Sequence, residues 1–224
     1  LRVLSTNDLH GTLEPVRDAA DSTVVLGGVA VLDAIMDSAT ARCRCATLRL
    51  DAGDMLQGTL ASTLDHGSTM LAAVKGMGVA VAALGNHEFD WGQDTLRARL
   101  GQSPFPWVSA NLFDSATGRR VPWVASHRLL TLGGLRVAVV GYMTKHFKRV
   151  IKAEHTRGLQ VRPGVAAIRD VLDSVPTART IQGLGQLIPG VTFNQPDVGG
   201  SRAMQQTYFF VRGTGSAQTV VMVD

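Results

Sequence analysis

This sequence has few residues for covalent cross-links, and no segment long enough to span a membrane. Its 224 residues include two cysteines, and aromatic residues make up 5% of the chain. Cys43 and Cys45 are two positions apart, a spacing that seldom satisfies disulfide geometry, so they do not reveal a redox compartment. No stretch approaches the roughly 20 apolar residues that cross a bilayer, and the chain opens in a strand rather than in a charged and apolar leader. We therefore expect no membrane span, and an export signal that is either missing or already removed.

The chain also lacks a strong excess of charge of one sign. It has 22 Lys and Arg against 18 Asp and Glu, a formal net charge of +4. The basic residues are dispersed except for one cluster, made of Lys145, Lys148, Arg149, Lys152 and Arg157. This cluster has two interpretations, a solvated loop or a surface that attracts a phosphate-bearing substrate. Nucleic-acid binding is not expected, because regular aromatic interleaving is missing from these basic residues.

Hydrophobic residues, in contrast, make up 45% of the chain. Their spacing is typical of helices in some segments and of strands in others. This content suffices for one sizeable core, so we expect residues 1–224 to form a single domain. Helical spacing covers residues 27–37, 68–75, 94–100 and 165–175, with Ser68 expected as a helix cap. Strand patterns cover 79–84, 107–111, 207–211 and 219–223, with a hairpin from 129–131 to 137–140. The alternation predicts an α/β layered fold.

Three apolar segments each end in a turn that carries residues of the metal-ligand type. These residues are Asp8 and His10 after the first segment, Asp54 after the second, and Asn86, His87 and Asp90 after the third. Alternate side chains of a strand point the same way, so we expect Asp8 and His10 to approach one ion from one face. Gly53 removes a side chain beside Asp54, which lets that carboxylate approach a metal closely. Open α/β sheets usually bind small molecules and ions past the carboxyl ends of their strands, which is where these three turns are expected to lie.

Taken singly, these residues also have ordinary structural interpretations. Asp8 and Asn86 are of the types that form turns, and Asp54 is of the type that caps helices. One functional site is favoured only because Asp8, Asp54 and Asn86 occur together with His10, His87 and Asp90 in register. Asp51 is expected to be structural, closing the strand before Gly53.

The three turns resemble a known set of motifs. Asp8-Leu9-His10, Gly53-Asp54 and Gly85-Asn86-His87-Glu88 are similar to the ordered D-x-H, G-D and G-N-H-E blocks of the calcineurin-like metallophosphoesterases. Their extended forms, residues 7–11 and 85–92, resemble the 5'-nucleotidase branch of that family. The resemblance extends over residues 1–142 and implies a layered β-sandwich flanked by helices.

The resemblance also implies a reaction and a role for each motif residue. In such enzymes a pair of divalent metal ions acidifies a bound water and clamps the phosphoryl oxygens. Asp8 and His10 would bind the first ion, Asp54 would bridge both ions, and Asn86 would bind the second. His87 would not be a ligand but would act on the phosphoryl group, with Asp90 orienting its ring, so these two are the expected catalytic residues. The ligand types do not distinguish zinc, manganese and iron.

The sequence departs from the family pattern after Asp90. Relatives supply further metal histidines in an S-H-type block and a G-H-x-H block, and neither occurs here. The other histidines, His66, His127, His146 and His155, are expected to be ordinary turn, loop or strand residues. Relatives also hold the nucleobase with a separate C-terminal domain, which we expect this chain to lack. Residues 176–205 fit no pattern.

These observations lead to two functional hypotheses. The first is a metal-dependent phosphoester hydrolase resembling 5'-nucleotidases, in which metal-bound hydroxide attacks a nucleotide or a similar phosphomonoester or cyclic phosphodiester. The alternative is a shortened or degenerate relative that binds metal or a phosphorylated ligand without turnover. The resemblance favours a periplasmic or extracellular location. The sequence does not predict the oligomeric state.

Overall fold

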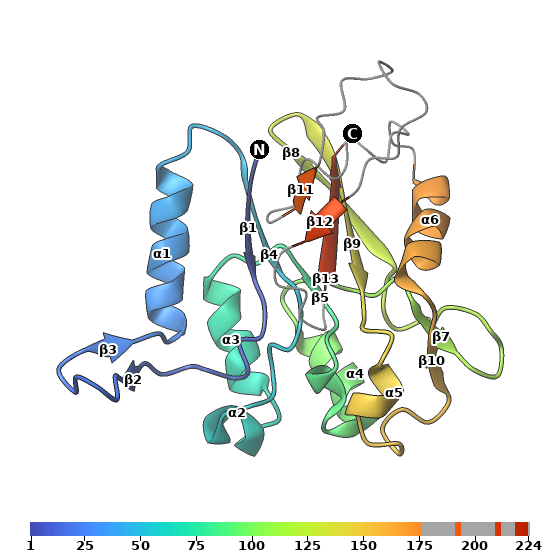
Figure 1. Cartoon of the computed structure of the whole chain (residues 1–224), viewed down its shortest axis with the longest axis horizontal. Coiled ribbons are helices and arrows are strands. Elements are labelled where there is room, and N and C mark those ends of the chain that lie inside the picture. The colour runs from blue at the N-terminus through green and yellow to red at the C-terminus, as the bar shows by residue number, and fades with distance from the viewer. Residues whose placement is uncertain (176–190, 194–208, 212–217, 224) are drawn as a thin grey trace.

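A parallel sheet forms the centre of the N-terminal part of the molecule (Figure 1). The computed structural model describes residues 1–175, 191–193, 209–211 and 218–223. The sheet contains β1 (Arg2–Thr6), β4 (Thr47–Asp51), β5 (Val81–Ala83) and β6 (Trp107–Val108), side by side in that order and all parallel. β5 and β6 are buried throughout, as expected for strands that are covered on both faces.

A second, antiparallel sheet packs against the first. It consists of β13 (Gln218–Val223), β9 (Leu135–Tyr142) and β8 (His127–Leu132), in that order. Gly133 and Gly134 join β8 to β9 with φ of 57° and 82°, a two-residue turn that requires positive φ at both positions. The hairpin and the strand expected at 219–223 are therefore confirmed.

The two sheets share an apolar interior, so the layered β-sandwich implied by the resemblance is confirmed. Leu48, Leu50 and Val81 from the parallel sheet form one buried cluster with Val137 and Val139 from β9. Because strand side chains alternate, Ala138 and Val140 of β9 face the opposite way.

Helices cover the two outer faces of this sandwich. They are α1 (Val29–Ala41), α2 (Leu60–Leu64), α3 (Ser68–Gly76), α4 (Gly92–Gln102), α5 (Phe147–Val150) and α6 (Gly164–Ser174), with a short 3-10 turn η1 (His87–Phe89). Met36, Met70 and Leu96 bring α1, α3 and α4 into the main core, whereas α6 packs Ala167 and Val171 onto β9. In Figure 1, α1 and α6 accordingly stand on opposite flanks of the sheets.

Three short strand pairs complete the described residues. They are β2 (Val16–Arg17) with β3 (Val25–Leu26), β7 (Leu112–Asp114) with β10 (Leu159–Val161), and β11 (Val191–Phe193) with β12 (Phe209–Val211). The strand expected at 207–211 is confirmed for 209–211, and its first two residues lie outside the described part of the chain. The region 176–205, which fitted no pattern, also lies outside it except for β11. Among the helices of the described residues, none has the length and apolarity to cross a membrane.

Two local expectations were wrong. Ser68 is the first helical residue of α3 rather than its cap, because Gly67 takes the preceding position with φ of 82°. The Asp65 carboxylate instead accepts a hydrogen bond from the Thr69 N–H, at 2.7 Å. Cys43 and Cys45 form a disulfide, since the bend after α1 brings their Cα atoms to 5.1 Å, within the usual range for such a bond.

Candidate functional site

The three motif turns meet at one edge of the parallel sheet. β1, β4 and β5 are neighbours with the same direction, so the segments after Thr6, Asp51 and Ala83 leave the sheet side by side. The first two turns are joined directly, because the Asp8 N–H donates to the Gly53 carbonyl and the His10 N–H to the Asp54 carbonyl, both at 3.0 Å. The predicted position of the three motif turns, past the carboxyl ends of neighbouring strands, is therefore confirmed.

Asp8 and His10 reach this edge in a different way from the one expected. β1 ends at Thr6, and both residues adopt left-handed backbone conformations, with φ of 52° and 48°. The alternation of side chains along a strand therefore does not set the direction of these two side chains. Asp8 Oδ1 nevertheless lies 3.6 Å from His10 Nε2. Asp54 is also left-handed, with φ of 55°. Such strained residues are uncommon and concentrate at functional sites.

Gly53 and Gly85 allow the second and third turns to touch. Gly53 has a φ of 101°, and a Cβ there would lie 2.5 Å from the Gly85 N atom. A Cβ on Gly85 would collide with the Asp54 carboxylate. Any side chain at either position would therefore separate Asp54 from the turn that carries Asn86 and His87.

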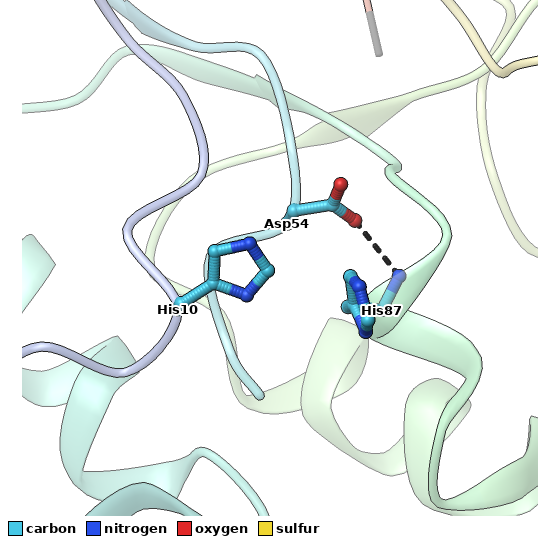
Figure 2. A group of neighbouring side chains, drawn as sticks. All are labelled: His10, Asp54 and His87. Atoms are coloured by element: carbon cyan, nitrogen blue, oxygen red, sulfur yellow. Dashed lines mark hydrogen bonds between the residues drawn. The ribbon is translucent and has the colours of Figure 1, made fainter. Parts of the chain in front are cut away.

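His10, Asp54 and His87 converge at this junction (Figure 2). One ligand atom from each lies within 4.8 Å of the others, and within the described residues no other group of three such side chains could hold a metal ion. The two imidazole rings meet edge to face, with centroids 4.9 Å apart. Two imidazoles and a carboxylate suit a divalent transition metal, but this set differs from the one that the resemblance implies, because it includes His87 and leaves out Asp8.

Each histidine is oriented through its Nδ1 atom. His10 Nδ1 lies 2.9 Å from the Gln57 carbonyl oxygen, which can only accept a hydrogen bond, so Nδ1 carries the proton and Nε2 remains free as an acceptor. His87 Nδ1 lies 2.6 Å from Asp90 Oδ2. Fixing a ring through the nitrogen that faces away from the site is how proteins commonly set the tautomer of a functional histidine.

The other predicted residues border this cluster. Asp54 Oδ1 accepts a hydrogen bond from the His87 backbone N–H at 2.8 Å, which fixes its carboxylate. Asn86 is 6% exposed and directly precedes η1, so it lies beside His87 at the third motif turn. Asp8 lies at the rim, with 45% of its side chain exposed.

Buried carboxyl groups gather beneath the site. Burial raises the pKa of Asp54, and it raises the pKa of Glu88 to about 7 and that of Asp51 to about 8. Burial alone would lower the pKa of His87, but the bond to Asp90 and the nearby charge of Asp54 outweigh it and raise that pKa. Burial makes these carboxyl groups costly to ionise, and a cation bound nearby would stabilise their charged forms.

Glu88 has a role that no residue pattern predicts. Its carboxylate is 1% exposed and accepts hydrogen bonds from backbone N–H groups of the Asp54 and Gly85 turns. The acidic residue is visible in the sequence, but its partners are backbone groups, which have no sequence signature. Gln57 was missed for the same reason, because it acts through its carbonyl oxygen.

Asp51 is confirmed as a structural residue. Its carboxylate accepts hydrogen bonds from Thr6 Oγ1 at 2.7 Å and from the Gly53 N–H at 2.8 Å, and it is fully buried. These two bonds tie the end of β1 to the turn before Asp54. Asp51 thus supports the site from below without facing it.

Asp51 should make folding stability depend on pH. Its pKa rises from 3.8 to about 8 on folding, so between these values the folded protein holds a proton that the unfolded chain has released. The free energy of unfolding should therefore fall as the pH rises from 4 towards 8. Asp51→Asn should flatten that decline, which urea unfolding at pH 5 and pH 8 would measure. Equal slopes in both proteins would contradict this expectation.

The remaining histidines lie outside the three-residue cluster, as expected. His127 begins β8 and contacts Ser126, His146 precedes α5, and His66 occupies the turn between α2 and α3. His155 belongs to the loop after α5. The segment that carries the basic cluster packs beside the third motif turn, because the Gln93 side chain donates to the His155 and Arg157 carbonyls.

A sandwich with this strand-edge cluster of histidines and aspartates defines a metallophosphoesterase domain. No protein-family model matches the chain. Curated relatives do match: bovine 5'-nucleotidase is 35% identical over 152 residues, which make up 65% of this chain and 26% of the relative. A 2',3'-cyclic-nucleotide 2'-phosphodiesterase/3'-nucleotidase of Yersinia enterocolitica is 32% identical over 127 residues, covering 53% of this chain and 19% of the relative.

A solved structure agrees with these sequence matches. The 5'-nucleotidase precursor of Thermus thermophilus superimposes with a TM-score of 0.68 at 30% identity, over 77% of this chain and 34% of that one. The chain belongs to the 5'-nucleotidase branch of the calcineurin-like metallophosphoesterases. It spans about a quarter to a third of the length of the bovine and Thermus relatives.

Proposed function

We propose that this chain carries the metal site of a phosphohydrolase that acts on a nucleotide or a similar phosphomonoester or cyclic phosphodiester. The observation that carries this proposal is the convergence of His10, Asp54 and His87 from three separate turns, with His87 backed by Asp90. A structural role for these residues would not require two imidazoles and a carboxylate to share one small volume with their ligand atoms facing each other.

The proposed ligands are those that the motifs imply. Asp8 and His10 would hold one divalent ion, Asn86 would hold a second, and Asp54 would contribute to both. Two observations support this assignment: His10 is oriented through Nδ1, which leaves Nε2 towards Asp8, and the Asp54 carboxylate is fixed by the His87 N–H. When bound, such ions acidify water and neutralise charge on the phosphoryl oxygens.

His87 and Asp90 supply the proton chemistry in this proposal. With Nδ1 bonded to Asp90, His87 keeps Nε2 for the substrate, and its raised pKa favours the protonated ring. Water attacks phosphorus, the bond from phosphorus to the leaving oxygen breaks, and the Nε2 proton passes to that oxygen. The attacking water releases one proton to solvent, and His87 takes up a proton from solvent before the next turnover. Before this transfer, the imidazolium compensates for charge that develops on the phosphoryl group.

The relatives support the proposed substrate and location. Those that match are named for activities on 5'-nucleotides and on 2',3'-cyclic nucleotides, so a nucleotide is the proposed substrate. The Thermus relative is described as a precursor, which supports an exported, periplasmic or extracellular protein. A single domain over residues 1–224 stays a prediction, supported by the pairing of β13 with β9.

A second candidate function is binding of a metal or a phosphorylated ligand without turnover. It is favoured because the described residues contain one three-ligand group, and because the downstream histidine blocks of the family do not occur in the sequence. Two ions need more protein ligands than the motif residues supply. The two candidates differ in metal content and in turnover.

Metal content and turnover should be measured on the same preparation. Protein purified without chelator is assayed for zinc, manganese and iron, and for Mn²⁺-stimulated hydrolysis of p-nitrophenyl phosphate and AMP. The hydrolase proposal expects bound metal, turnover, loss of turnover after EDTA treatment and its return with Mn²⁺. Bound metal without turnover would favour the binding candidate, and protein without metal or turnover would contradict both.

A further inference from the structure

Glu88 is a buried carboxylate that the proposed reaction does not use. It lies in η1, directly after His87, and is 1% exposed. Its Oε2 accepts hydrogen bonds from the N–H groups of Gly85 at 2.8 Å and Asp54 at 3.0 Å. Its Oε1 accepts from the N–H of Met55 at 2.8 Å and from that of Leu56 at 3.3 Å. One side chain therefore receives four backbone donors from two different turns.

This arrangement explains how the Asp54 turn keeps its unusual backbone. Gly53 and Asp54 both have positive φ, which turns successive N–H groups of residues 54–56 towards one point. Consecutive N–H groups that converge in this way form a concave anion-binding surface, and here the anion is supplied by the protein itself. Charge-assisted bonds of this type are stronger than bonds between neutral groups.

Glu88 is not placed to bind the ion directly. Both carboxylate oxygens are already engaged by backbone N–H groups, and the residue is absent from the cluster of His10, Asp54 and His87. Its effect on the site must therefore pass through the backbone that carries Asp54 and Asn86. This defines a positioning role.

We propose that Glu88 is the residue that locks the Asp54 turn to the Gly85–Asn86 turn and so holds the metal ligands at binding distance. The metal-affinity part rests on the proposed function, whereas the locking of the turns does not. Without the carboxylate, four buried N–H groups would lose their partner, and Asp54 would be free to leave its left-handed conformation.

The test compares Glu88→Gln and Glu88→Ala with a stability control, Val139→Ala. Val139 is fully buried in the interior between the sheets and belongs to the other sheet, so its truncation lowers stability without altering the site. Glu88→Gln keeps the shape of the side chain, and it remains informative if Glu88→Ala does not fold. Circular dichroism establishes which variants are folded.

The first readout is amide hydrogen exchange in metal-free protein. In Glu88→Gln the amides of Asp54, Met55 and Gly85 should exchange at least about tenfold faster than in the wild type, while β9 amides keep their protection. In Val139→Ala, the β9 amides should exchange faster and the three turn amides should keep their protection. Unchanged exchange at the three turn amides in folded Glu88→Gln would overturn the inference.

The second readout is Mn²⁺ affinity by calorimetry. Loss of a group that orients metal ligands typically weakens binding by about 10 to 100-fold, so we expect the dissociation constant of Glu88→Gln to rise by that factor and that of Val139→Ala to stay unchanged. Wild-type affinity in a folded Glu88 variant would overturn the metal-affinity part. If the wild type itself bound no Mn²⁺, the proposed function would fail, and amide exchange alone would decide the locking role.

Discussion

Asp54→Asn is expected to abolish hydrolysis and to remove tightly bound metal. Asp54 lies at the centre of the candidate site, within ligand distance of both His10 and His87, and its carboxylate is held by the His87 N–H. Asparagine has the same shape but carries no charge, so it would hold a divalent cation far less strongly. Removing one preorganised electrostatic group usually lowers turnover by about 100 to 1000-fold, and loss of the metal would lower it further.

Metal content per chain and the rate of AMP hydrolysis measure this effect. Asp173→Asn is a matched control, because Asp173 is exposed on α6, away from the motif turns, and the same change there should leave both quantities unaltered. Full metal content and an unchanged rate in folded Asp54→Asn would show that the cluster is not the catalytic centre. Loss in both variants would point to a general effect of charge instead.

The location of the site could be predicted from the sequence because its determinants are local. Each motif turn follows an apolar strand, and parallel neighbouring strands necessarily bring their carboxyl ends to one edge. The glycine beside Asp54 was recognised as a device for close approach. The structure adds that Gly53 and Gly85 must both be glycine because their turns touch.

The features that the sequence did not predict depend on backbone conformation. Strand alternation was expected to aim Asp8 and His10, but β1 ends before them and left-handed turns aim them instead. The anchoring of Asp54 by Glu88 depends on where N–H groups point, which follows from φ values that no residue pattern specifies. The disulfide between Cys43 and Cys45 likewise depends on a bend that composition does not reveal.

His87→Ala is expected to lower turnover strongly while leaving the metal bound. His87 contributes one of the three ligand atoms that could hold an ion, so geometry alone permits it to be a ligand. Its bond to Asp90 raises the pKa of His87, which is the property expected of a proton donor. A general acid contributes about 100 to 10,000-fold, and kcat should fall within that range.

Asp90→Asn further distinguishes the two possible roles of His87, which are proton donor and metal ligand. Asp90 contacts His87 but is not a member of the cluster, and asparagine in its place can still bond to Nδ1 while it no longer stabilises a charged ring. If His87 is the acid, Asp90→Asn should lower kcat by less than His87→Ala does, with metal content unchanged in both. If His87 is a ligand, His87→Ala should lose metal and Asp90→Asn should weaken its binding. Metal content in this pair of variants therefore decides whether the third turn supplies a ligand or a proton donor.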